Sequence, residues 1–308
     1  MNQETNKLIF AFNYAWGLDT VHHSVKNEWN VNNKSLGQCA VTSLIVQEYL
    51  GGDIHYGTVL TNGVNHYWNI INNKKYDFTI SQFTNNDIIN KIGIKQREDI
   101  LKNIDTYNRY IILKQRVNIF FNKLKDIESS INKCQLCQLD KVYGDNIYFG
   151  TNTKILFVGE APAKNGWRIT GKAWINEKNK IIPSGKILEK LLENMNISLF
   201  DISFVEIIKC FPSDRKKLKY YSENCLSFFN KQLELLKPDV IITLGEIPTK
   251  ILLNNIKFSK LSDVVGKEYS YNSRITLIPI YHPSPISPKS FKGNKPIFDN
   301  IILKYLKK

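Results

Sequence analysis

The second half of the chain alternates short apolar runs with amphipathic segments, and this alternation limits the possible folds most strongly. Residues 154–162 have the continuous apolar core of a strand buried on both faces. Residues 184–195 have the spacing of an amphipathic helix. Further strands are predicted at 202–210, 239–246 and 275–285, and a further helix at 221–236. Alternation of this kind predicts a mainly parallel sheet with helices on both faces.

Motifs rich in Gly, Pro and charged residues follow each predicted strand. They are GEAP (159–162), KCFP (209–212), GE (245–246) and HPSP (282–285). In a parallel sheet of this type, ligands bind beyond the carboxyl ends of the strands. We therefore expect the functional site of this half to be assembled from these four loops.

Four of the five cysteines lie in the same half: Cys134, Cys137, Cys210 and Cys225. The sequence has no apolar run of ~20 residues and no secretory pattern at its N-terminus, so we expect a cytoplasmic protein without membrane contact. In that compartment, clustered cysteines indicate metal binding or catalysis more often than disulfides. Four thiolates can bind zinc or an iron–sulfur cluster, and their number alone does not distinguish the two.

Together, these motifs resemble those of the family 4 and family 5 uracil-DNA glycosylases. The resemblance covers about 134–300 and includes Cys134-x2-Cys137 before VGEAP, the segment IIKCFPSDRKK, Cys225 ahead of QLELLKPDVIITLGE, and YHPSP. It implies a DNA glycosylase that acts on DNA. It also implies a structural [4Fe-4S] cluster, with zinc as the alternative, held by Cys134, Cys137, Cys210 and Cys225.

The resemblance also assigns roles around the base to be removed. Such enzymes extrude a base and cleave its bond to the sugar, so positive charge develops on the sugar and negative charge on the base. His282 matches the histidine that faces base and sugar, and Glu160, followed by Ala161, matches the acidic position of family 4. Trp174 falls where the family has a Phe that stacks on the base.

Glu206 departs from the family pattern, which has an Asn at this position to read uracil. A side-chain amide can donate to uracil O4 and accept from N3–H, whereas an ionised carboxylate can only accept. We therefore predict that a modified, deaminated or amino-bearing base is a better substrate than uracil. A protonated Glu206 would still accommodate uracil.

The segment 286–296 follows Ser284 of the HPSP motif and contains lysines around an aromatic residue. Its family counterpart enters the DNA minor groove. Lys289 and Lys292 flank Phe291, which fits basic contacts to phosphate around an apolar wedge. A solvated surface loop is the alternative interpretation.

The first half contains a second set of residues typical of catalysis. Residues 39–50 predict a helix with Cys39 at its start, where the helix N-terminus favours a thiolate. Residues 66–80 predict two short strands that carry His66 and Asp77, and residues 97–131 predict helix. This order of Cys, His and Asp is typical of papain-like and transglutaminase-like enzymes. The segment 14–115 also resembles the YunG-like bacterial domains.

The expected fold class is therefore α/β. We predict a small α+β papain-like domain (1–120), a helical connector (121–133) and a three-layer αβα sandwich with a four-stranded, mainly parallel sheet (134–308). The net charge of +14 lies mostly in the sandwich: 27 Lys+Arg against 16 Asp+Glu from Cys134 onward, and 15 against 12 before it. This excess suits a nucleic-acid partner.

Two functions fit these features. The first is a glycosylase that hydrolyses the N-glycosidic bond of an extruded base. The alternative is a module that binds modified DNA without cleaving it and guides an N-terminal cysteine hydrolase or deamidase, for example in defence against phage. The sequence does not indicate an oligomeric state.

Overall fold

The structure is a computed structural model that describes residues 3–306 except 62, 85–86, 88, 142–144, 165 and 171. The chain divides into two compact units, Met1–Lys123 and Leu124–Lys308. The division falls within one long helix, α4 (Ile104–Lys133), which continues through the segment predicted as a connector. In the described part of the chain, no helix is both long and apolar enough to cross a membrane.

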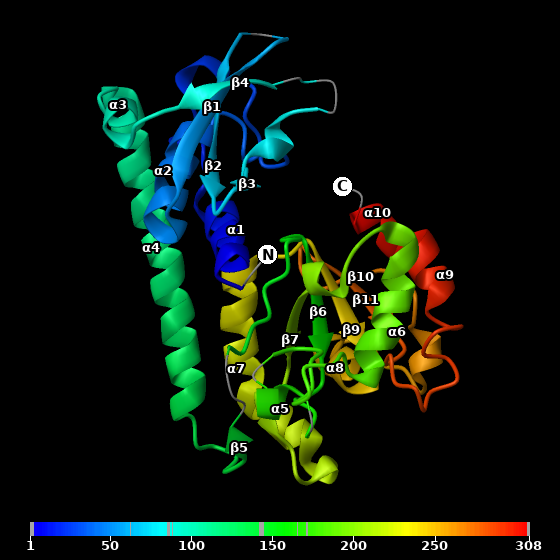
Figure 1. The fold of residues 1–308 in the computed structure, drawn as a ribbon. Helices are drawn as coiled ribbons and strands as arrows, with labels where there is room; N and C mark the ends of the chain where they lie inside the picture. Colours follow the sequence, from blue (N-terminus) through cyan, green and yellow to red (C-terminus); the bar gives the residue numbers. More distant parts are fainter. Residues whose placement is uncertain are drawn as a thin grey trace. The chain divides into compact units, whose positions relative to one another are not determined.

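The first unit is built on a four-stranded antiparallel sheet with the order β3-β2-β1-β4 (Figure 1). Its strands are β1 (Asp53–Val59), β2 (Asn65–Ile71), β3 (Lys74–Tyr76) and β4 (Ile89–Ile94). The predicted hairpin over 66–80 corresponds to β2 and β3. Asn72 and Asn73 form its turn with φ of 48° and 61°, a conformation that Asn tolerates well.

The first unit also contains several helices. They are α1 (Gln3–Ala15), α2 (Cys39–Leu50), α3 (Arg97–Leu101) and the first part of α4, with short 3₁₀ turns η1 (His23–Val25) and η2 (Ile80–Gln82). The predicted helix 39–50 is confirmed to the residue. It packs on β1 and β2 through fully buried Leu44 and Ile45. The helix ends at Gly51, whose φ of 75° is accessible to glycine.

The second unit contains a five-stranded sheet with the order β10-β11-β9-β6-β7. Its strands are β6 (Ile155–Gly159), β7 (Ser203–Glu206), β9 (Val240–Leu244), β10 (Tyr269–Ser270) and β11 (Thr276–Ile280). The four predicted strands are present and mutually parallel, as expected. The fifth strand, β10, is a two-residue antiparallel edge that the sequence pattern did not reveal.

The predicted strand 202–210 is too long, because the chain changes partners within it. β7 ends at Glu206, and Cys210 belongs to β8 (Cys210–Phe211), which pairs with β5 (Asp140–Lys141) in a separate two-stranded sheet. Between them, the N–H groups of Ile207 and Ile208 donate to Gly159 and Glu160. This turn moves Cys210 away from the main sheet and towards the other cysteines.

Alternate residues of each strand face opposite helical layers, which produces the three-layer sandwich. Phe157, Ile242 and Ile278 share a buried cluster with α6 (Pro183–Leu192) and the C-terminal segment. Their neighbours Leu156 and Ile241 are fully buried but lie outside that cluster. Figure 1 shows α6 on one side of the sheet and α7 (Leu218–Leu236) on the other.

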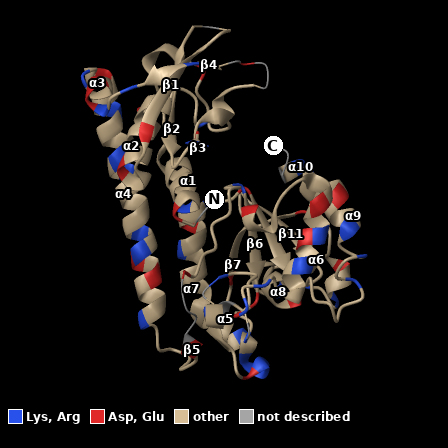
Figure 2. Ribbon diagram, in the orientation of Figure 1, with Lys and Arg blue, Asp and Glu red and all other residues tan. Residues whose placement is uncertain are grey.

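Short elements connect these layers. They are α5 (Trp167–Thr170), η3 (Glu193–Met195), η4 (Leu199–Asp201), η5 (Arg215–Lys217), α8 (Glu246–Leu252), η6 (Leu261–Asp263), α9 (Lys295–Ile297), the π-helical turn η7 (Phe298–Ile302) and α10 (Leu303–Leu306). Acidic and basic residues are mixed along α4 (Figure 2). The long helix therefore offers no uniformly basic face for a polyanion.

Candidate functional site

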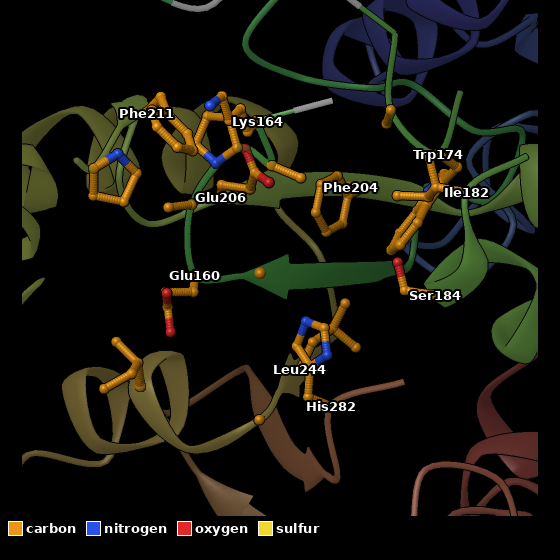
Figure 3. A pocket seen from close by; sticks show the side chains of 18 of the residues that line it. Glu160, Lys164, Trp174, Ile182, Ser184, Phe204, Glu206, Phe211, Leu244 and His282 are labelled. Atoms are coloured by element: carbon orange, nitrogen blue, oxygen red, sulfur yellow. The ribbon is translucent and has the colours of Figure 1, made fainter. Parts of the chain in front are cut away.

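A pocket of about 510 Å³ opens at the carboxyl ends of the parallel strands. Its walls come from the loops after β6, β7, β9 and β11, which are the four loops identified in the sequence. Glu160, Glu206 and His282 all line it, together with Ala161 and Trp174. Figure 3 shows Glu206, Phe204 and Trp174 on one side of the strand that leads to Glu160, and His282 on the other.

Glu206, the last residue of β7, is only 8% exposed. Burial raises the pKa of its carboxyl group well above the usual value; the cation of Lys209 opposes this shift and the carboxylate of Glu160 adds to it. Burial therefore favours the neutral acid, which carries one donor and one acceptor. The ionised form assumed for the predicted discrimination against uracil is the disfavoured form in this pocket.

Lys209 lies beneath Glu206 and is also buried. Its ammonium group donates to the backbone oxygen of Glu206 and, over 2.5 Å, to Oε1 of Gln232. Burial lowers the pKa of Lys209 to about 8. These bonds fix the end of β7 and so the direction of the Glu206 side chain.

His282 follows β11, and its ring is open to the pocket. The surrounding protein lowers its pKa, mainly through desolvation and secondarily through the charge of Arg215. The imidazole is therefore neutral near pH 7 and can donate one N–H. Gly245 packs against it with φ of 93°, and a Cβ atom there would lie 3.0 Å from the Cβ of His282.

Glu160 is paired with a residue that the sequence analysis did not select. Arg215 donates from Nη2 to Oε1 of Glu160 over 2.6 Å. The Arg215 side chain is 70% exposed, so the pair lies at the pocket mouth. The signal in the sequence that could have identified Arg215 was the basic segment SDRKK after the third cysteine of the second unit.

Trp174 lies deeper than a simple stacking platform would. It is 6% exposed, belongs to the buried cluster under α6, and packs on Phe204 with ring centroids 4.6 Å apart. Phe204 also lines the pocket. Sequence reasoning missed Phe204, although its position two residues before Glu206 on one strand places both on the same face.

The residue predicted as the wedge in the loop after HPSP, Phe291, is partly buried. Phe291 packs against the buried cluster, and its backbone oxygen accepts from Asn294 and Lys295. Ile286 is instead 91% exposed. An apolar residue between the two Ser-Pro segments of this loop was the overlooked signal.

Two basic residues of this loop are exposed. Lys289 and Lys292 both lie on the surface, and the Lys289 ammonium sits 5.2 Å from the ring centroid of Tyr281. Ser284 is half-buried, and its backbone N–H donates to the oxygen of His282 over 2.7 Å. The loop thus begins in direct contact with the pocket residue.

The four cysteines of this unit surround one small cavity. Cys134 and Cys137 follow the end of α4, Cys210 starts β8, and Cys225 lies on α7. All five cysteines of the chain are described, and none forms a disulfide. Asn224 donates from Nδ2 to the sulfur of Cys137 over 3.3 Å. Four thiols that converge from separate elements fit a shared metal centre.

The Cys, His and Asp of the first unit also come together. Cys39 is the first residue of α2, and His66 lies on β2. Asp77 follows β3 rather than lying on it, so its predicted strand position is wrong, but its carboxylate accepts from His66 Nε2 over 2.8 Å. The predicted trio is therefore assembled in space.

Comparison with known proteins agrees with the two-unit organisation. Residues 147–307 match the family model of the uracil DNA glycosylase superfamily, and residues 4–122 match that of the YunG protein. The second unit is thus an αβα sandwich with a polar pocket at the carboxyl ends of its strands. The chain belongs to the uracil DNA glycosylase superfamily, whose enzymes hydrolyse N-glycosyl bonds.

Individual relatives show the same division. The type-4 uracil-DNA glycosylase of Archaeoglobus fulgidus is 29% identical over 171 residues, which are 53% of this chain and 82% of that protein. The type-4 enzyme of Saccharolobus solfataricus is 32% identical over 167 residues, 51% of this chain and 74% of that protein. The uncharacterized protein YunG of Bacillus subtilis is 40% identical over 57 residues, 18% of this chain and 48% of that protein.

Proposed function

We propose that the second unit is a DNA glycosylase that extrudes a uracil-like pyrimidine and hydrolyses its N-glycosidic bond. The observation that carries this proposal is the strand-end pocket, which Glu206 and His282 both line and in which desolvation raises the pKa of Glu206 and lowers that of His282. Neutral hydrogen-bonding groups suit an uncharged base, because neither imposes an uncompensated charge on it.

Glu206 is the base-reading residue of this proposal. As a neutral acid, it donates to O4 of uracil and accepts from N3–H, as a side-chain amide would. With its proton on the other oxygen, the same acid accepts from an exocyclic amino group and donates to N3 of a cytosine-type base. Uracil and an amino-bearing pyrimidine are therefore both proposed substrates.

His282 and Glu160 assist bond cleavage in this scheme. The neutral imidazole of His282 donates a hydrogen bond to the base oxygen on which negative charge develops. Glu160 holds the attacking water or stabilises the positively charged sugar, and the hydrogen bond from Arg215 holds its carboxyl group in place. Phe204 and Trp174 supply the aromatic wall against which the base stacks.

The loop after His282 is proposed to contact the duplex. Ile286, which is 91% exposed, would enter the base stack in place of the extruded nucleotide. Lys289 and Lys292 lie on the surface of the same loop and would bind phosphates on either side. This arrangement couples base extrusion to the position of His282 at the start of the loop.

A structural [4Fe-4S] cluster is proposed at Cys134, Cys137, Cys210 and Cys225. The cluster would fasten β8 and α7 to the end of α4, and zinc remains the alternative metal. Iron and acid-labile sulfide measured in protein purified without oxygen test this assignment. Stoichiometric zinc in place of iron would reject it.

The activity test presents duplexes that each contain one uracil, xanthine, hypoxanthine, cytosine or modified cytosine. Released bases are identified by mass spectrometry, and the remaining abasic sites are measured by strand cleavage. We expect release of uracil or of an amino-bearing pyrimidine. Selective binding without release of any base would favour the non-cleaving DNA-binding module instead.

The base-reading role is tested with Glu206→Gln, and Glu189→Gln on the exposed face of α6 is the matched control. The amide keeps one donor and one acceptor, so uracil release should persist within about tenfold, while the preference between uracil and amino-bearing bases shifts. An unchanged preference across all five duplexes would contradict the role of Glu206.

A further inference from the structure

The residues around Cys39 in the first unit have the arrangement found around an activated thiol. Nε2 of His66 donates to Oδ2 of Asp77 over 2.8 Å. The thiol of Cys39 donates to the backbone oxygen of Asn65 over 3.9 Å and is near enough to His66 to raise the pKa of its ring. His66 is fully buried, and the Asp77 side chain is only 6% exposed. The three groups therefore form one continuous chain from a carboxylate to a sulfur atom.

Gln82 and Phe83 fix the orientation of the imidazole. The Gln82 amide nitrogen lies 3.3 Å from His66 Nδ1 and donates to Thr79 O over 3.0 Å, while its oxygen accepts from the N–H of Gly37. The ring of Phe83 meets the imidazole edge-on, with centroids 4.7 Å apart. The ring is thus held with Nε2 towards Asp77.

Cys39 opens onto a cavity of about 490 Å³, a volume typical of small-molecule sites. Ala40, Asn65 and Tyr67 form the wall around the thiol. Cys39 begins a twelve-residue helix, and its N-cap residue, Gln38, makes no side-chain capping bond. The backbone N–H groups of the first helical turn therefore face the region of the thiol without a side-chain cap.

The charges of this cavity do not select an anion. Arg109 lines it, but its guanidinium donates to Asp105, Thr106 and the oxygen of Thr20. Lys95 and Asp99 supply one charge of each sign. A neutral substrate fits this lining better than a carboxylate or phosphate.

A metal site explains this arrangement poorly. Nε2 of His66 is already bound to Asp77, so His66 and Cys39 would provide only two direct ligands, fewer than zinc requires. Purely structural roles for His66 and Cys39 would not explain why the cysteine opens onto a cavity of this size. The geometry is instead that of a nucleophile, a base and a group that orients the base.

We propose that the first unit is a cysteine amidohydrolase, in which Cys39, His66 and Asp77 cleave a neutral acyl–nitrogen bond. The Cys39 sulfur attacks the carbonyl carbon while His66, as an imidazolium, holds the proton that the thiol has given up, and the first-turn N–H groups of α2 stabilise the oxyanion. The carbon–nitrogen bond then breaks, and the amine leaves with the proton from His66. Water adds to the thioester, the carbon–sulfur bond breaks, and the acid leaves while the thiol is restored.

An amide is favoured over an ester because its nitrogen must be protonated before it leaves. Although burial opposes protonation, the bonds to Asp77 and Cys39 raise the pKa of His66 to about 9. The imidazolium is therefore the main form near neutral pH and can act as the acid. The acyl–nitrogen bond can come from a peptide backbone or from a side-chain carboxamide.

Thiol reactivity gives the first test, on the full chain with its metal centre loaded. The protein is treated with iodoacetamide from pH 5 to pH 9, and alkylated cysteines are identified by peptide mass spectrometry. We expect Cys39 to react about tenfold or more faster than free cysteine at pH 6, and Asp77→Asn to remove most of this excess. Asp53→Asn, at an exposed aspartate at the start of β1, is the matched control. Reactivity equal to that of free cysteine would overturn the nucleophile assignment.

Substrate class is tested in two arms, with peptidyl aminocoumarin amides for backbone cleavage and glutamine- or asparagine-containing peptides for ammonia release. Turnover should fall to background in Cys39→Ala and about 10²–10⁴-fold in Asp77→Asn. Thermal unfolding of each variant shows whether it is folded. Hydrolysis in one arm identifies the source of the amide, and the absence of hydrolysis in both arms by the wild type would overturn the amide assignment.

Discussion

Each unit has a candidate site that contains a histidine and an acid, but the pKa shifts of these residues have opposite signs in the two units. In the second unit, burial raises the pKa of Glu206 and lowers that of His282, so both groups tend towards neutrality. In the first unit, hydrogen bonding raises the pKa of His66 to about 9 and lowers that of Asp77, so both tend towards their charged forms.

The difference shows that direct contact between the histidine and the acid, rather than the residue types, decides the direction of their pKa shifts. His66 and Asp77 touch each other, so the charge of each supports the charge of the other despite burial. Glu206 and His282 enter their pocket from different loops, and desolvation is the largest influence on each. Neutral groups suit recognition of an uncharged base, whereas a charged pair suits activation of a thiol.

Removal of the neutral donor at the strand-end pocket should have the largest effect. We expect His282→Ala to slow single-turnover base release by about 10²–10³-fold, because the charge that develops on the base loses its hydrogen bond. In the wild type, the lowered pKa of His282 should keep the rate level from pH 8 to below pH 6.5. Lys190→Ala on the exposed face of α6 is the control. A rate that instead rises as His282 becomes protonated would break the contrast between the sites.

The charged pair should make the first unit less stable as the pH rises. The pKa of His66 is about 9 when folded and 6.5 when unfolded, so the folded state binds more protons between these values. The stabilisation is complete below pH 6.5, is lost towards pH 9, and amounts to at most about 3 kcal/mol. Urea unfolding, followed by hydrogen exchange in β2 peptides, should show this decline in the wild type. Asp77→Asn should flatten it, and an equal decline in both proteins would count against the pair.

Burial of Glu206 should also make the protein less stable as the pH rises, by a smaller amount. Because the pKa of Glu206 is raised on folding, the folded state holds its proton above pH 4.5 while the unfolded state releases it. Stability therefore falls as the pH rises above 4.5. Glu206→Gln should remove this fall and be more stable than the wild type at pH 8, by roughly 1 kcal/mol. Identical urea midpoints for the two proteins at pH 4 and pH 8 would show that Glu206 is ionised in the pocket.

Much of the candidate site could be predicted because strand ends converge. Once residues 154–162, 202–210, 239–246 and 275–285 were assigned as parallel strands, their terminal motifs had to meet at one edge of the sheet. Glu160 and His282 line one pocket for this reason. Glu206 lay inside the predicted strand 202–210 and joins them because β7 ends at that residue. Local pattern similarly fixed the start of α2 at Cys39 and the hairpin that carries His66.

The wedge and stacking residues could not be assigned in the same way. Phe291 and Ile286 are both apolar residues in one polar loop, and only packing shows that Phe291 is anchored in the buried cluster while Ile286 is exposed. Trp174 matched a stacking position by alignment of motifs, but its contact with Phe204 depends on where α6 covers the sheet.

By itself, the sequence determined the four parallel strands of the second unit, the helix that begins at Cys39 and the residue types available for chemistry, because periodicity and turn residues act over short stretches of chain. Only the tertiary structure decided the direction of the pKa shifts of Glu206 and His282, the pairing of Glu160 with Arg215, and the convergence of the four cysteines on one cavity. Desolvation and Coulomb energy depend on atoms that are distant in sequence and close in space.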